Sequence, residues 1–191
     1  MFKTLLNKYI FYFKILSLSL CALTLFSCSS QKNPVLYQST FNFSAIKQYS
    51  FYVSDSPFYN SQSLSHDQRN RIEIAIEKAL NKKNLTYTKP VNAEIIVTYH
   101  ITKGSRLDYQ AYNKVVRFCA ACLKANTWQQ HNNDWHVYNN GLIIDLVNPT
   151  KERSVWRSIS PLKFDSKDSG AERNEKIVNA VNVMLGQYLE Q

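Results

Sequence analysis

Two stretches of the sequence place apolar residues at helical spacing. They constrain the fold more than any other feature, because each must bury one face against something else. The first runs over about 67–83 and the second over about 171–189. Ser65, with Gln68 three residues later, predicts a capping box at the start of the first helix. The apolar faces consist of Ile72, Ala75, Ile76, Ala79 and Leu80 in the first helix, and Ile177, Ala180, Val181, Met184, Leu185 and Tyr188 in the second.

Four other segments have the composition of strands: 47–53, 95–101, 142–147 and 154–162. The segment 95–101 is β-branched nearly throughout and apolar on both faces, which is typical of a central strand. Because two amphipathic helices need one sheet face to bury against, the sequence predicts an α+β fold. We expect a two-layer sandwich, with a mostly antiparallel sheet of about four to five strands and the two helices on one face.

The last two strands flank a polar turn at 148–153, and this turn sets their register. Pairing about Lys151 sets Leu146 opposite Trp156, Val147 opposite Val155, and Ile143 opposite Ile159. The same register sets Asp145 opposite Arg157, and opposite residues share a face. We therefore interpret Asp145 and Arg157 as a structural cross-strand salt bridge. The alternative is that Asp145 is a catalytic acid or a metal ligand.

The N-terminal residues 1–27 have the pattern of a secretory signal peptide. Lys3, Lys8 and Lys14 are followed by an uncharged apolar run, and the segment contains no acid. The run from Ile15 to Ser27 is shorter than the roughly 20 residues that span a bilayer. We therefore favour a signal peptide over a transmembrane anchor.

The apolar run ends in Leu25-Phe26-Ser27-Cys28, which resembles a bacterial lipobox. The resemblance implies cleavage before Cys28 and lipidation of that cysteine, so that the membrane is reached through an N-terminal lipid. No Asp follows Cys28, and by resemblance to lipoprotein sorting in enteric-type bacteria this favours the outer membrane. We expect a periplasm-facing lipoprotein with a signal peptide over 1–27, a lipidated tether over 28–40 and a single domain over 41–191.

Composition excludes several functional classes. The four glycines are far apart, so the sequence has no glycine-rich loop for a phosphate, and we expect no nucleotide cofactor. The net charge is +9, but the basic residues are scattered, as on a solvated, mildly basic surface. A periplasmic address also argues against nucleic acid as a partner.

Cys119 and Cys122 form a Cys-Ala-Ala-Cys motif with three interpretations. We favour a disulfide, because the periplasm is oxidising. The second interpretation is a metal site with His131 and His136, although zinc fingers have a longer middle segment. The third is a redox-active pair of the thioredoxin type, for which the surrounding β-α-β pattern is not visible.

The segment 103–138 is ambiguous, and we expect one or two irregular strands with a long exposed excursion. The excursion holds Trp128, His131, Trp135 and His136 beside several amide side chains. Aromatic residues beside amides often line a binding surface, so these four residues are our candidate partner surface. The alternative is that they pack this long loop onto its own domain.

Several segments resemble a family of bacterial lipoproteins known as DUF4136, a domain of unknown function. Its Gly-x-Leu-x-Ile-Asp and Val-Trp-Arg motifs are similar to residues 141–145 and 155–157. An aromatic strand at 49–52, a strand at 93–99 and a C-terminal Met-Leu at 184–185 also fit. The sequence departs from the family at Ser158, where a glycine is usual, and at Glu94, where an Asp is usual. The resemblance implies no activity and says nothing of Cys119 and Cys122.

These features favour an interaction protein that serves as an accessory or binding component of an envelope complex. The alternative is a carrier or sensor of a lipid or small apolar ligand, held between helices and sheet. We do not expect an enzyme, because no serine lies in a Gly-x-Ser-x-Gly turn. A Cys119–His131 nucleophile pair and redox activity of Cys119 and Cys122 are the enzymatic alternatives.

Overall fold

A mixed sheet of seven strands organises the protein in the computed structural model, which describes residues 33, 35–52, 64–102, 104–125 and 141–188. The strand order is β3-β2-β4-β6-β7-β1-β5. The strands are β1 (Val35–Tyr37), β2 (Gln48–Phe51), β3 (Thr86–Tyr87), β4 (Ile95–Ile101), β5 (Lys124–Ala125), β6 (Gly141–Asn148) and β7 (Arg153–Pro161). The helices are α3 (His66–Asn81), α4 (Arg106–Val115) and α5 (Gly170–Gly186), with the short 3-10 turns η2 (Phe43–Ala45), η3 (Pro90–Asn92) and η4 (Ala120–Cys122).

The sheet is larger and less antiparallel than the sequence predicted, although the α+β class is confirmed. β2 pairs in parallel with both β3 and β4, because α3 lies between β2 and β4 in the chain and returns it to the same end of the sheet. The pairs β4–β6, β6–β7, β7–β1 and β1–β5 are antiparallel. The additional strands are β1, β3 and β5, which have only two or three residues each and therefore carry little periodic signal.

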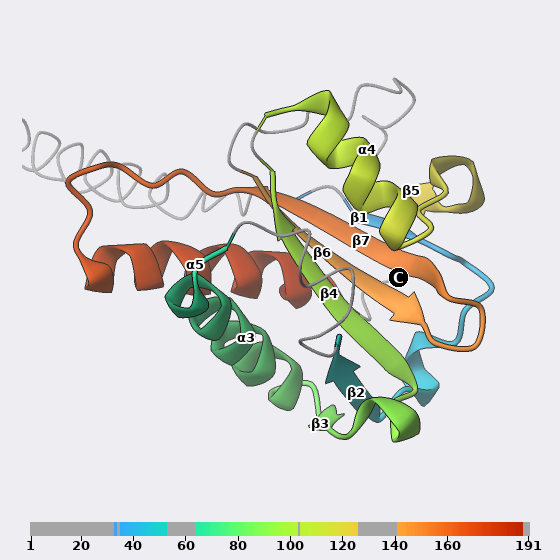
Figure 1. Cartoon of the computed structure of the whole chain (residues 1–191). Coiled ribbons are helices and arrows are strands. Elements are labelled where there is room, and N and C mark those ends of the chain that lie inside the picture. Colours follow the sequence, from blue (N-terminus) through green and yellow to red (C-terminus); the bar gives the residue numbers. More distant parts are fainter. Residues whose placement is uncertain (1–32, 34, 53–63, 103, 126–140, 189–191) are drawn as a thin grey trace, which may run out of the picture. The chain divides into compact units, whose positions relative to one another are not determined.

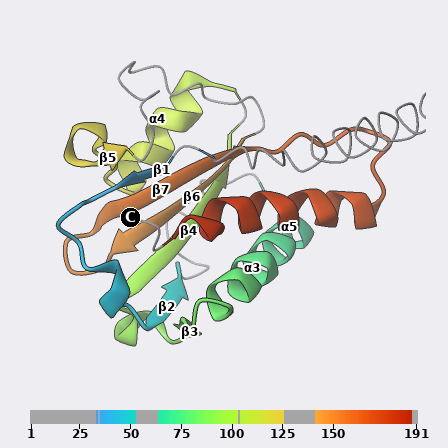
Figure 2. The same ribbon diagram turned by 180° about the vertical axis from the view of Figure 1, so that it is seen from behind.

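Helices α3 and α5 lie together on one face of the sheet, as the sequence predicted (Figures 1 and 2). Their apolar faces share one core with alternate residues of β4 and β6, such as Val97, Tyr99 and Leu146. Trp156 and Tyr188 lie fully buried in this core with their rings edge to face, 6.5 Å between centroids. The predicted capping box at Ser65 and Gln68 is confirmed, with hydrogen bonds in both directions.

A third helix, α4, covers the opposite face and corrects the expectation of irregular strands after residue 103. It begins at the N-cap Ser105, and its residues Tyr109 and Tyr112 point toward a second core with Ile143 and Ile159. The described part of the protein therefore has three layers rather than two. None of its helices is long and apolar enough to cross a membrane.

The β6–β7 register corrects one predicted pair. Leu146 faces Trp156 as expected, but the register shifts after Leu146, and Val147 pairs with Ser154 rather than Val155. Val155 is thus the extra residue of a bulge, and its side chain joins the core under α3 and α5. The bulge places a hydroxyl, rather than a methyl group, beside Asp145.

Strand β1 lies within the segment 28–40, which the sequence analysis assigned to a tether. Val35 and Leu36 are buried, and β1 lies between β7 and β5 in the sheet. Because these residues contribute ladder hydrogen bonds and apolar burial, the folded domain begins by Val35.

We expect Ser65→Ala to lower the free energy of unfolding by about 1 kcal/mol, because the amide of Gln68 loses its hydrogen-bond acceptor at the start of α3. In a domain of this size the melting temperature should fall by about 2–4 °C. Thermal unfolding followed by circular dichroism measures this shift. Ser166→Ala, at an exposed loop position, is the control, and an equal shift in both variants would contradict the capping role.

Candidate functional site

A cluster of polar side chains lies buried between α4 and the sheet. It consists of Thr98 from β4, Asp145 from β6, Ser154 and Arg157 from β7, and Tyr112 and Asn113 from α4. Asp145 and Arg157 are both completely inaccessible to solvent. The strand period of two directs these side chains to the α4 face, while their neighbours Leu146 and Trp156 point to the other core. We call this group the buried polar cluster.

Asp145 is the acceptor at the centre of this cluster. Its Oδ1 accepts from Ser154 Oγ at 2.5 Å and from Arg157 Nε at 2.9 Å, and its Oδ2 accepts from Tyr112 Oη at 2.6 Å. Because the Tyr112 proton points to Asp145, Thr98 Oγ1 donates to Tyr112 Oη across 2.8 Å. Burial, followed by the negative charge of Asp145, raises the pKa of Tyr112 well above its usual value. The tyrosine therefore remains a neutral donor.

Arg157 is held by α4 and by the residues just after it. Its Nη1 donates to Asn113 Oδ1 at 2.6 Å and to Tyr109 Oη at 3.3 Å. The Phe118 ring lies over the guanidinium, with 3.5 Å between its centroid and Cζ. Within the described residues Nη2 has no hydrogen-bond partner, so the ring face is its main contact. The guanidinium thus ties α4 and Phe118 to β7.

His100 extends the cluster toward the start of α4. Its ring stacks on Tyr112 with 4.7 Å between centroids, and its Nε2 lies 2.9 Å from Asp108 Oδ2. His100 is buried, and Asp108 is in the first turn of α4. The contact therefore holds the N-terminal turn of α4 against β4. The geometry of the whole cluster is that of a structural clamp, because all of its hydrogen-bonding side-chain groups except Arg157 Nη2 bond to one another.

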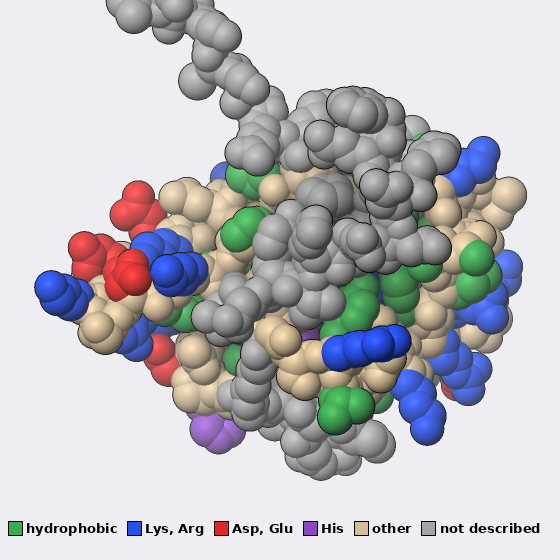
Figure 3. Space-filling view, turned by 90° about the horizontal axis from the view of Figure 1, so that it is seen from above, with side chains coloured by type: hydrophobic (Ala, Val, Ile, Leu, Met, Phe, Trp, Pro, Cys, Tyr) green, Lys and Arg blue, Asp and Glu red, His purple; other side chains and the backbone are tan. Residues whose placement is uncertain are grey.

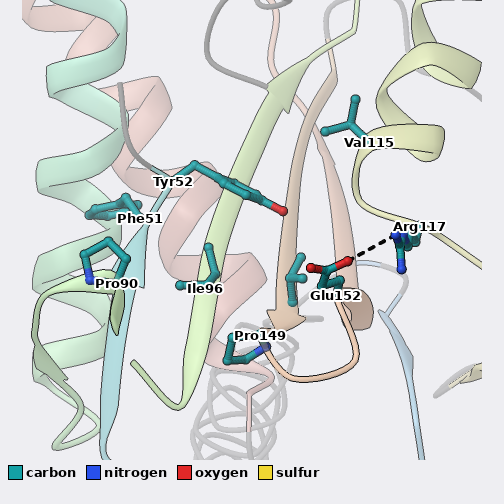
Figure 4. Close-up of a pocket in the computed structure, with 9 residues that line it drawn as sticks. Phe51, Tyr52, Pro90, Ile96, Val115, Arg117, Pro149 and Glu152 are labelled. Carbon is teal, nitrogen blue, oxygen red and sulfur yellow. Dashed lines mark ion pairs between the residues drawn. The ribbon is translucent and has the colours of Figure 1, made fainter. Parts of the chain in front are cut away.

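A pocket of about 400 Å³ opens on the same face, where α4 ends and does not cover β4. We call it the Tyr52 pocket, and it is lined by Phe51, Tyr52, Pro90, Ile96, Val115, Arg117, Val147, Pro149 and Glu152. Tyr52 reaches over β4 from the end of β2, and Phe51 and Pro90 lie on that side (Figure 4). Arg117 and Glu152 lie on the other side. Burial, with Asp145 and Glu152 adding to it, raises the pKa of Tyr52, so its hydroxyl is protonated at neutral pH.

The mouth of the Tyr52 pocket carries an ion pair on an unusual backbone. Arg117 Nη2 lies 3.1 Å from Glu152 Oε2, and both side chains are largely exposed. Arg117 has φ 46° and Glu152 has φ 48°, the left-handed region that is unfavourable for such residues. Backbone strain of this kind persists only where the surrounding structure holds it, and it is often found at binding sites.

Cys119 and Cys122 are joined by a disulfide, in agreement with the first of the three sequence interpretations. Cys122 is exposed, and its Sγ lies 3.8 Å from Nη1 of Arg153 at the start of β7. A sulfur in a disulfide is not a thiolate, the form that binds metals or attacks substrates. In the ranges that the structure describes, no three His, Cys, Asp or Glu side chains gather as metal ligands would.

Several predicted site residues lie outside the described residues. These are the lipidation site Cys28 and the candidate partner surface formed by Trp128, His131, Trp135 and His136. His131 and His136, which belong to the alternative metal set, therefore also lie outside the described residues. Asp145 and Arg157, in contrast, lie side by side in the predicted register and form the expected ion pair.

Sequence reasoning missed the α4 half of the buried polar cluster and the Tyr52 pocket. A signal for α4 was present, because Tyr109, Tyr112 and Val116 have helical spacing after the N-cap Ser105. The pocket had no such signal. Its lining comes from β2, η3, β4, β6 and the segments after α4 and β6, which only the folded chain brings together.

Comparison with known proteins agrees with the resemblance noted in the sequence. Residues 35–188 match the family described as domain of unknown function DUF4136. None of the curated proteins matches the chain. The family match begins at the first residue of β1 and covers every element of the described fold.

Three solved structures are similar to this chain to different degrees. A crystal structure of a DUF4136 family protein from Bacteroides thetaiotaomicron has a TM-score of 0.50 at 14% identity, over 80% of this chain and 92% of that chain. A PDZ domain protein from Parabacteroides distasonis has a TM-score of 0.42 at 14% identity, over 84% of this chain and 37% of that chain. A PelC dodecamer from Paraburkholderia phytofirmans has a TM-score of 0.36 at 9% identity, over 73% and 87%.

We expect Asp145→Asn to lower the free energy of unfolding by about 3–5 kcal/mol, because it leaves the buried guanidinium of Arg157 without its counter-charge. Arg157→Met should be similarly costly, since it leaves Asp145 unpaired. The double variant should be less destabilised than the sum of the two, by about 1–3 kcal/mol. Urea unfolding measures all three variants.

The exposed Asp165→Asn, which removes a carboxylate 3.5 Å from Lys176, is the control and should change stability by less than about 0.5 kcal/mol. Additive effects of Asp145→Asn and Arg157→Met would contradict the structural ion pair.

Proposed function

This chain belongs to the DUF4136 family, and from that premise we propose that it is an outer-membrane lipoprotein whose domain is a binding component of an envelope complex. The observation that carries the proposal is the contrast between the two polar features on the α4 face. The buried polar cluster is closed and serves α4, whereas the Tyr52 pocket is open to other molecules. In the described lining no Ser, Cys or His is present, and the carboxylate of Glu152 is paired with Arg117, which favours binding over catalysis.

The lipid anchor would keep the domain close to the membrane. Seven residue steps separate Cys28 from Val35, where β1 begins. Fully extended, they span at most about 25 Å. A partner of the domain is therefore a membrane-bound or membrane-proximal envelope component.

The alternative, a carrier with its ligand between the helices and the sheet, has less support. That space is filled by large side chains that are fully buried, including Tyr49, Leu146, Trp156 and Tyr188. A packed interior of this kind leaves no room for a ligand without rearrangement of the core. The Cys119–His131 nucleophile also loses support, because the disulfide leaves Cys119 without a thiolate, whereas a redox-active pair would itself have this oxidised form.

We expect Cys28→Ala to abolish incorporation of labelled palmitate and to move the protein out of the membrane fraction, because the acylated sulfur is lost. Fractionation of the producing bacterium, followed by immunoblotting, measures this change. Cys21→Ala, which removes the other cysteine of the N-terminal segment, is the matched control and should leave both properties unchanged. Labelled, membrane-bound Cys28→Ala protein would contradict the anchor.

The binding function predicts that the full-length lipidated protein, purified gently from its own membranes, retains the same protein companion in repeated preparations. Mass spectrometry identifies the companion, and cross-linking reports whether it lies against the α4 face. A preparation that carries a stoichiometric lipid or small molecule and no protein would favour the carrier instead.

A further inference from the structure

The Tyr52 pocket combines an apolar floor with a basic rim, and this combination defines the ligand that it fits. We propose that it binds an acidic peptide segment of a partner protein through one aromatic or large apolar anchor side chain. The proposal rests on the binding function above and names the chemistry of the partner.

The floor of the pocket accommodates an apolar anchor. Ile96 from β4 and Val147 from β6 form the floor, and Val115 at the end of α4 extends it. Val115 is 36% exposed, which is notable for an apolar residue beside a core. The volume of about 400 Å³ lies in the range of sites that enclose a small ligand or a single large side chain.

The rim is basic. Arg117 lines the mouth, where Glu152 pairs with it, and the exposed Lys114, Lys151 and Arg153 are chain neighbours of the lining residues Val115 and Glu152. Lys and Arg side chains gather at the end of the molecule where α4 and the β6–β7 turn lie, with few acids between them (Figure 3). Charge complementarity therefore favours carboxylates on the partner and speeds their encounter.

The segment after α4 and the turn after β6 hold the rim residues in position before a ligand binds. Arg117 and Glu152 both have left-handed backbone conformations, and their ion pair joins the two segments across the mouth. The Ser154 amide also donates to the Val116 carbonyl at 2.9 Å. A rim that is already positioned loses less conformational entropy when a ligand binds.

A peptide fits the pocket better than a lipid acyl chain does. Ile96 and Val147 are only 8% and 2% exposed, so the apolar floor is too small for a long chain, and a single anchor would make most of its contacts with Val115 and the ring of Tyr52. The walls instead include the ring of Tyr52 and Pro90, which suit an aromatic side chain (Figure 4). Aromatic anchors in such pockets supply much of the energy of protein interfaces.

The test uses the full-length lipidated protein in phosphatidylcholine nanodiscs and fluorescence anisotropy of a labelled peptide, acetyl-Asp-Glu-Trp-Glu-Asp-amide. We expect saturable binding that weakens as salt rises from 50 to 500 mM, because salt screens the rim charges. Replacing the peptide's Trp by Ala, or its acids by Lys, should weaken binding by roughly tenfold or more. Absence of binding by the acidic Trp peptide would overturn the proposal.

Variants locate the site. Lys114→Glu with Lys151→Glu should weaken peptide binding roughly tenfold, because two rim charges are reversed. Lys163→Glu with Lys167→Glu makes the same change in net charge on the exposed loop before α5 and should leave binding within about twofold. Equal losses in both double variants would show a nonspecific charge effect and overturn the proposal.

A photoreactive benzoylphenylalanine in place of the peptide's Trp should cross-link to Tyr52, Ile96 or Val115, and cross-links confined to other surfaces would overturn the proposal. Dihexanoyl phosphatidylglycerol tests whether the ligand is a lipid headgroup. If this lipid binds instead of the peptide, and the Lys114→Glu, Lys151→Glu variant loses that binding, the site belongs to a headgroup and the proposal is overturned. If a protein companion purifies equally well with the wild-type protein and with the Lys114→Glu, Lys151→Glu variant, the binding function is supported, but the Tyr52 pocket is not the binding surface.

Discussion

The ion pair between Asp145 and Arg157 is the interaction on which the α4 half of the molecule depends. Two fully buried charges lose their hydration, and their mutual attraction compensates only when the remaining donors and acceptors are also satisfied. Tyr112 and Asn113 from α4, and Ser154 from the bulge in β7, supply most of those partners, and the Phe118 ring covers the guanidinium, whose Nη2 has no hydrogen bond among the described residues. The pair therefore does not merely join two neighbouring strands. It requires a helix with these polar side chains to lie over them.

This requirement explains why the two faces of the sheet differ. The face under α3 and α5 is filled by apolar side chains, whose packing is not directional and needs only volume and periodicity. The face under α4 has a smaller apolar core and is also held by directional hydrogen bonds concentrated on β6 and β7. As α4 is only ten residues long and sits over those strands, it does not cover the part of β4 beside β2. The Tyr52 pocket is the surface that this short helix leaves accessible.

The segments that follow α4 connect the structural clamp to the proposed binding surface. Phe118 lies on the buried Arg157, while Arg117, one residue earlier, reaches Glu152 at the mouth of the pocket. The disulfide of Cys119 and Cys122 closes the next turn. A binding surface built in this way has its charged groups positioned by a buried network before any partner arrives. In the proposed function, the lipid anchor limits where that surface acts, and the pocket determines what it recognises.

Much of the architecture was determined by local sequence patterns. Helical spacing located α3 and α5, β-branched composition located β4, and the turn at 148–153 set Asp145 opposite Arg157. These patterns suffice because they reflect the period of one element or the geometry of one turn. Only the tertiary structure decided that β1, β3 and β5 extend the sheet, that α4 covers its second face, and that the bulge brings Ser154 to Asp145. The tertiary structure alone also decided the pocket, since residues as distant in sequence as Tyr52 and Glu152 line it. The periodicity of a sequence reflects single elements and does not show which separate elements contact one another.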